Sequence, residues 1–195
     1  FKSLDLSKNS FINDVDVRYT GISTISFGEG SRIKELKASE ALTSLVLNKC
    51  DNLKLENITI DGTPLNTDGG KNISVIEVNN SAGLNHANKF REFIVAWMKK
   101  GDVTSKSLIL RGVKWDNVKI GELETIREFL IGDENGKKAM QCIITGTIQM
   151  GPDKIMSSDL EMFNSLVKAL GGSLTIKIPY ANIILNRVKT EIVAG

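Results

Sequence analysis

The sequence predicts an α/β solenoid with a continuous parallel sheet, backed by loops in its first half and by helices in its second half. Two observations lead to this prediction. A nine-residue apolar pattern recurs through about residue 81, and amphipathic segments of helix length alternate with strand-like segments after it. The chain has 195 residues, of which 41% are hydrophobic, so it is long enough for one sizeable domain or an elongated one.

The recurring pattern begins with FKSLDLSKN, in which Phe1, Leu4 and Leu6 are apolar and Asn9 follows. Apolar residues two positions apart lie on one face of a short strand, so each copy predicts one strand with an apolar inner face. A single unit cannot bury that face, whereas stacked units can. The further copies have the apolar pairs Ile25 and Phe27, Leu45 and Leu47, Ile58 and Ile60, Ile76 and Val78, with a weaker copy in Ile33, Leu36 and Ala38.

After Val78 the strands are farther apart and helices are expected between them. Apolar residues from Phe90 to Met98 and from Leu123 to Leu130 follow helical spacing. A third helix is expected over 158–170, where Ser158 and Glu161 form a capping box. The strands expected between these helices are KSLILRGV, QCIITGTIQM and SLTIKI. Connections of this length favour parallel strands joined with a right-handed crossover.

The nonamers resemble the leucine-rich repeat family, because Leu4-Leu6-Asn9 and Leu45-Leu47-Cys50 match the motif L-x-x-L-x-L-x-x-N/C. The irregular spacing is similar to that of divergent bacterial or phage repeats. The second half is similar to terminal repeats in large proteins of gut bacteria and their phages, which are often followed by immunoglobulin-like modules. The resemblance implies a repeat domain over 1–178. Residues 179–195 would be an exit segment, a linker or the first strand of such a module.

No catalytic constellation is expected, so we expect no enzyme activity and no cofactor. His86 is the only histidine and has no partner at metal-ligand spacing. GDENGKK, residues 132–138, lacks the register of a phosphate loop and is expected to be a polar loop. Cys50 and Cys142 are expected to be buried thiols. Calcium binding stays open for two loops that carry oxygen ligands, with Asn13, Asp14 and Asp16 in one and Asp61, Asn66 and Asp68 in the other.

The surface expected to carry function is the exposed face of the sheet, opposite the apolar pairs. Its residues are mostly small and polar, with few charges and no aromatic ring. An inert scaffold face is the alternative interpretation. The candidate binding residues are Asp5, Thr24, Ser26, Val46, Asn48, Thr59, Asp61, Glu77, Asn79, Ile109 and Arg111.

The net charge of +2 argues against a nucleic-acid partner, and no apolar run reaches the ~20 residues that span a bilayer. We expect a structural or recognition module of a larger protein, which binds a protein, a surface glycan or other virion proteins. The first setting is a phage tail, fibre or baseplate, where the module is a spacer or a receptor-contacting arm. The second is the surface of a gut-type bacterium, as an adhesin, and the third is an accessory domain of an enzyme. The chain begins mid-pattern, and we expect the natural protein to extend upstream.

Overall fold

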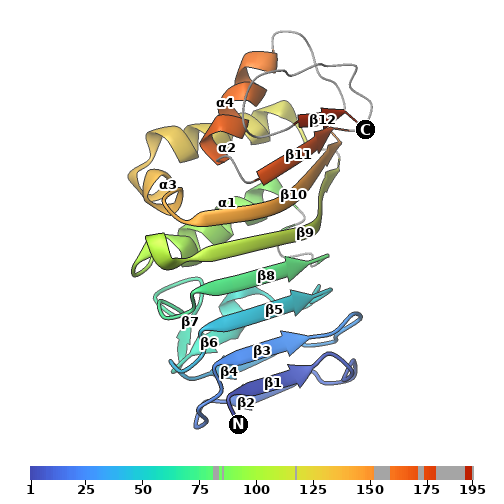
Figure 1. Ribbon diagram of the computed structural model, residues 1–195, viewed down its shortest axis with the longest axis vertical. Coiled ribbons are helices and arrows are strands. Elements are labelled where there is room, and N and C mark those ends of the chain that lie inside the picture. The colour runs from blue at the N-terminus through green and yellow to red at the C-terminus, as the bar shows by residue number, and fades with distance from the viewer. Residues whose placement is uncertain are drawn as a thin grey trace.

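The computed structural model describes residues 1–80, 84, 86–116, 118–151, 159–170, 174–178 and 192–194. It is an α/β structure in which a long parallel sheet forms one side (Figure 1). That sheet has eight strands, in the order β1-β3-β5-β8-β9-β10-β11-β12. Their bounds are Ser3–Leu6, Thr24–Phe27, Ser44–Asn48, Val75–Asn79, Ser107–Asp116, Ile143–Gly151, Leu174–Ile178 and Ile192–Ala194.

Parallel pairing in exact register stacks the apolar residues of the nonamers on one another. Leu4 lies beside Ile25, Ile25 beside Leu45, Leu45 beside Ile76, Ile76 beside Leu108, and Leu108 beside Ile144. We call this row the inner ladder. From Ile25 to Leu108 its members are completely buried. The predicted alignment of the sheet is therefore confirmed for these positions.

The back of the first half is a second sheet, not the loops expected from the sequence. It has the order β2-β4-β6-β7, with β2 Asp14–Val17, β4 Glu35–Ala38, β6 Ile58–Ile60 and β7 Thr63–Pro64. The first three strands are parallel, and β7 is antiparallel to β6. The copies that contain Leu36 and Ile58 therefore belong to this sheet, where Val15, Leu36 and Ile58 form a ladder of their own.

Helices cover the back of the second half, as the sequence predicts (Figure 1). α1 spans Ala87–Phe93 and continues as a π-helical turn, η3, over Ile94–Met98. α2 spans Ile120–Gly132 and α4 spans Leu160–Leu170. Ser158 of the expected capping box lies outside the described residues. Trp97 of η3 and Trp115 of β9 are fully buried, and their ring NH groups donate to the carbonyls of Ile73 and Leu84 respectively.

The prediction of a polar loop at GDENGKK was wrong, because Gly132 ends α2 and residues 134–138 are helical, which leaves only Asp133 between the two helices. Glu134–Ala139 forms a short helix, α3, which follows α2 directly. The Asp133 side chain accepts hydrogen bonds from the backbone NH groups of Asn135 and Gly136, so it is the N-cap of this helix. Gly136 is needed where α3 approaches α2, because a Cβ there would lie 2.2 Å from the Phe129 carbonyl oxygen.

The strands enter and leave the long sheet in the same way from repeat to repeat. At the entry to each strand, a backbone NH donates to the backbone carbonyl of the corresponding residue in the preceding unit. These donor and acceptor pairs are Ser107 and Ser74, Ser74 and Thr43, Thr43 and Ser23, and Ser23 and Lys2. Lys49 and Asn80, which follow β5 and β8, have left-handed φ values of 47° and 51°. Gly112, with φ of 64°, lies inside β9, where the register of its pairing with β10 shifts. These repeated bonds and turns keep neighbouring strands in register. Residues 192–194 continue the same sheet beside β11, and the division of the chain at residue 178 stays a prediction.

Two buried lysines hold the loop between β7 and β8. The Lys106 ammonium group donates to the carbonyls of Lys71 and Ile73 at 3.2 and 3.3 Å, and it lies 5.1 Å from the Trp97 ring centre. The Lys100 ammonium group donates to the Leu65 carbonyl at 2.7 Å. Burial lowers the pKa of each lysine to about 8, because the charged form loses its hydration.

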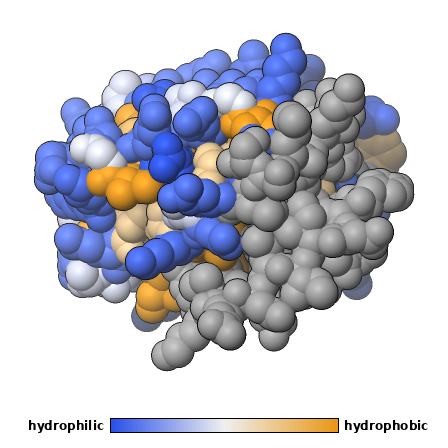
Figure 2. Space-filling view, turned by 90° about the horizontal axis from the view of Figure 1, so that it is seen from above, coloured by the Kyte–Doolittle hydropathy of each residue, from blue (hydrophilic) through white to orange (hydrophobic). Residues whose placement is uncertain are grey.

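The surface over these elements is mainly hydrophilic. Seen from above, the described residues show mostly polar side chains, with small separate hydrophobic patches (Figure 2). The apolar residues gather between the layers, in a single core that runs from Val15 to Leu174.

The inner ladder predicts that substitutions by Ala at two adjacent residues of β5 reduce the stability of the fold to very different extents. We expect Leu45→Ala to lower the free energy of unfolding by about 2 to 5 kcal/mol, because it leaves a cavity in a fully buried site. Val46→Ala on the outward side of the same strand is the matched control, and it should cost less than about 1 kcal/mol. Urea denaturation followed by circular dichroism measures both. Equal losses would contradict the assignment of the inward face.

The buried lysines contribute stability that increases with pH above about 8, whereas the two cysteines, whose pKa is raised to about 12, contribute stability that decreases above about pH 9. An unfolded lysine keeps its proton up to about pH 10.4, whereas the folded lysines lose theirs near pH 8. Between these values the unfolded state binds more protons, so the free energy of unfolding rises by at most about 1.4 kcal/mol per pH unit for each lysine. Below pH 8 the cost of burying the charge is fully present. Lys106→Met should reduce this rise in urea denaturation at pH 8 to 10, and an unchanged slope would contradict the assignment.

Candidate functional site

The outward side of the eight-stranded sheet, which we call the sheet face, carries most of the predicted binding residues. In β3, β5 and β8 the inward residues are buried and the outward ones are half-buried, whereas in β1 the inward residues are half-buried and the outward ones exposed. Asp5, Ser26, Val46, Glu77 and Ile109 form a continuous row across β1, β3, β5, β8 and β9. Asn48, Asn79 and Arg111 form a second row nearer the exit turns, and Thr24 lies in a third row at the entry.

Thr59 and Asp61 do not lie on the sheet face, and their placement there was wrong. Thr59 is in β6, whose partners are β4 and β7 of the second sheet. Asp61 follows β6 in a left-handed turn with φ of 47°, and its carboxylate accepts a hydrogen bond from the Glu40 backbone NH. The alternation of apolar residues in β6 is the same as in the long sheet. It shows which side chains turn inward but not which sheet the strand joins.

Polar contacts across strands bind the sheet face together. The Glu77 carboxylate pairs with the Arg111 guanidinium at 3.3 Å and accepts a hydrogen bond from the Asn79 amide at 3.0 Å. The Ser26 hydroxyl donates to the Asp5 carboxylate at 3.2 Å. The pKa of Asp5 is lowered, first by the hydrogen bond from the Ser7 backbone NH. Exposed pairs of this kind contribute little to stability, so they mainly set the orientation of the side chains.

Four apolar residues, which we call the apolar stripe, follow a zigzag line across β5, β8, β9 and β10 on the same face, with polar residues between them in each row. Val46, Val75 and Ile109 are half-buried, and Ile143 is 55% exposed. Ile143 lies beside Ser107 in the sheet, and Val75 lies beside Ser107 on its other side. The binding residues expected from the sequence omitted Ile143, although the alternation in IITGT turns Ile144 inward and Ile143 outward. A flat face with an apolar centre and polar neighbours is suited to contact with a macromolecule.

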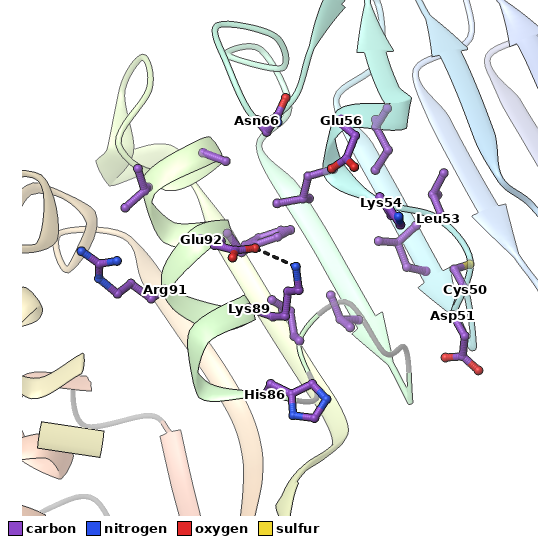
Figure 3. A pocket seen from close by; sticks show the side chains of 18 residues that line it. Cys50, Asp51, Leu53, Lys54, Glu56, Asn66, His86, Lys89, Arg91 and Glu92 are labelled. Atoms are coloured by element: carbon purple, nitrogen blue, oxygen red, sulfur yellow. Dashed lines mark hydrogen bonds and ion pairs between the residues drawn. The ribbon is translucent and has the colours of Figure 1, made fainter. Parts of the chain in front are cut away.

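A groove lies on the opposite side, where the back layer changes from strands to helices (Figure 3). Its volume is about 640 Å³, and it lies between α1 and the segment of the 3-10 turn η1, Leu55–Asn57, and β6. A helix is thicker than a strand, so the two kinds of backing layer do not meet flush. The floor is apolar and includes Leu47, Val78 and Phe93.

Charges of both signs form the rim of the groove. The Lys89 ammonium group pairs with the Glu92 carboxylate at 3.0 Å on α1 (Figure 3). Arg91 lines the groove as well, while its guanidinium lies 4.9 Å from the Phe129 ring centre. His86 is exposed at the start of α1 and makes no side-chain capping bond. The groove can accommodate an apolar group, and its rim carries no excess of one charge.

The geometry of the described residues gives little support to calcium binding at either of the two segments for which it was left open. Asp14 and Asp16 lie in strand β2, not in a loop, and the Asp16 carboxylate is engaged by the Arg18 guanidinium at 2.6 Å. That hydrogen bond lowers the pKa of Asp16 to about 2. Among the residues that the structure describes, there is no group of three or more His, Cys, Asp or Glu that could hold a metal ion.

The cysteines are both free thiols. Cys50 lies at the edge of the groove and is 2% exposed, and Cys142 is half-buried. Burial raises the pKa of each thiol to about 12. The reactive thiolate is therefore scarce at neutral pH.

We expect neither cysteine to react with iodoacetamide in the folded protein at pH 8 within an hour, because the raised pKa keeps both protonated. Both should react when the chain is unfolded in urea at the same pH. Glutathione at equal concentration provides the reference rate, and mass spectrometry counts the added groups. A native thiol that reacts as fast as glutathione would contradict the placement of that cysteine.

Comparison of this chain with protein-family models, with curated proteins and with solved structures gives no match. Among the described residues, no helix is both long enough and apolar enough to cross a membrane. The resemblance to leucine-rich repeats therefore depends on the residues of the nonamers alone, and a function can be stated only as a proposal.

Proposed function

We propose that the chain is a leucine-rich-repeat-type solenoid module without enzymatic activity, and that the sheet face binds its partner. The repeat assignment is supported by the inner ladder, in which residues of successive nonamers are lateral neighbours. It is also supported by the repeated entry bonds and by the left-handed residues Lys49 and Asn80, which follow the neighbouring strands β5 and β8. Each unit depends on its neighbours to bury its apolar residues, as expected for stacked repeats.

The apolar stripe on the sheet face is the observation that favours a recognition role over an inert scaffold. Val46, Val75 and Ile109 are β-branched apolar residues on three neighbouring strands, and they remain partly open to solvent. The Glu77–Arg111 pair adds polar groups beside them. A mixed, flat surface of this kind fits a protein or a surface glycan, whereas nucleic acid would require a basic stripe.

The setting that we propose is a phage virion, in which the module is a spacer or a receptor-contacting arm of a tail, fibre or baseplate protein. Long parallel sheets of stacked units maintain a fixed distance between their ends, which suits such an arm. An adhesin on the surface of a gut-type bacterium would use the same face. The class of ligand separates the two settings, because bacterial surface glycans indicate a phage receptor and host proteins indicate an adhesin.

The sheet face is tested by introducing negative charges at two of its apolar residues. We expect the double variant Val46→Glu/Ile109→Glu to lose at least tenfold in affinity for any ligand that the unmodified chain binds. Thr59→Glu is the matched control, since Thr59 is also half-buried on a strand but belongs to the second sheet. The probes are purified bacterial lipopolysaccharide, capsular polysaccharide and a panel of extracellular host proteins, measured by biolayer interferometry.

Circular dichroism first establishes that both variants remain folded. Equal loss of binding in the Thr59→Glu control, or full binding by the double variant, would place the interaction elsewhere. Absence of binding to every probe would leave only the spacer role.

A further inference from the structure

The groove beside α1 has the dimensions of a ligand site. Its volume of about 640 Å³ lies within the range of roughly 300 to 1,000 Å³ that is usual for such sites. Residues of α1 and η3 form one wall, and the segment that contains η1 forms the other (Figure 3). The floor between the walls, which includes Leu47, Val78 and Phe93, is buried and apolar.

A π-helical turn forms part of the α1 wall. The helix takes up this geometry at Ile94, and Val95 and Ala96 of the turn line the groove. π-helical turns are rare and occur frequently at functional sites. Val95 is half-buried, and so is Leu55 on the opposite wall. Each wall therefore offers one partly open apolar side chain above the buried floor.

The charged groups along the groove are of both signs, and two of them lack a partner. Within the described part of the chain, the side chains of Lys54 and Glu56 form no ion pair and no hydrogen bond. On the other wall, Lys89 and Glu92 neutralise each other (Figure 3). Two further charged side chains are directed away from the groove in Figure 3, Arg91 and Asp51. An occupant thus meets one free cation and one free anion on the same wall.

This pair of free charges discriminates between classes of occupant. A fatty acid would satisfy Lys54, but its apolar body would leave Glu56 partly desolvated without a partner, which is unfavourable. A polyanion would be repelled by Glu56 and Glu92. A peptide can place an acidic side chain at Lys54, a basic one at Glu56 and an apolar one between Leu55 and Val95. Complementary charges of this kind fix the register of a bound segment.

We propose that the groove binds a short peptide segment of a partner protein, in which an apolar residue lies between an acidic and a basic one. The acidic side chain pairs with Lys54 and the basic side chain with Glu56. The apolar side chain lies between the two walls, above the floor. The groove is on the side of the long sheet opposite the sheet face and shares no residue with it, so this site is independent of the ligand proposed for the sheet face.

The test uses a random heptapeptide library displayed on yeast and selected on the complete chain. The selected peptides are synthesised, and their affinities are measured by fluorescence polarisation. The double variant Lys54→Glu/Glu56→Lys exchanges two exposed charges and keeps the net charge. We expect it to lose at least tenfold in affinity for the selected peptides. The same variant should bind strongly again when the acidic and basic residues of the peptide are exchanged.

The matched control is Glu35→Lys/Lys37→Glu, which exchanges two opposite charges at the same spacing on β4, outside the groove. We expect its affinity to stay within twofold of that of the unmodified chain. Circular dichroism establishes that both double variants are folded. An equal loss in the control would show that the charges of the groove are not recognised specifically, and it would overturn the proposal.

Three other results would also overturn the proposal. The first is a selection that yields no binder, or only peptides without the acidic–apolar–basic pattern. The second is binding of dansyl-labelled undecanoic acid that the selected peptides do not displace, which would assign the groove to acyl chains. The third is loss of peptide binding in Val46→Glu/Ile109→Glu, which would place the peptide on the sheet face. Because that variant changes only the sheet face, a failure of either site is distinguishable from a failure of the other.

Discussion

Exact lateral register between parallel strands is the constraint on which the rest of this structure depends. Leu4, Ile25, Leu45, Ile76, Leu108 and Ile144 are neighbours across the long sheet, and each supplies part of the wall that buries the next. A slip by one residue would turn a strand's apolar side chains to solvent. The hydroxyl groups of Ser23, Thr43 and Ser74 reinforce the register, since each donates to the carbonyl of the preceding unit.

The register also explains where the molecule departs from regularity. The back layer changes from short strands before β8 to helices after it, and the chain between β6 and β8 is longer than the connections in the earlier units. Lys100 and Lys106 insert into this region, where they donate to loop carbonyls that no strand reaches. Buried amines are costly unless they are hydrogen-bonded, so these lysines act as fixed anchors for the loop. The groove beside α1 lies at the same transition.

The sheet face exists because every second residue of a strand must point away from the core. Those positions are free to carry Val46, Glu77 or Arg111 without disturbing the inner ladder, so they are suited to recognition by side chains.

The sequence by itself determined most strands of the long sheet, their inward residues and the main helices, but it placed Asp14 and Asp16 of β2 in a loop. The elements that it determined follow from periods of two and of about 3.6 residues, which are local properties of the chain. Leu45 and Ile76 were recognisable as core, and Phe90 to Met98 as a helical face. Only the tertiary structure decided that Leu36 and Ile58 belong to a second sheet, which removed Thr59 and Asp61 from the sheet face. It also decided that Lys106 is buried and that Ile143 extends the apolar stripe. A strand's alternation states which side is buried but not against which partner, because the partner is set by contacts between residues far apart in the chain.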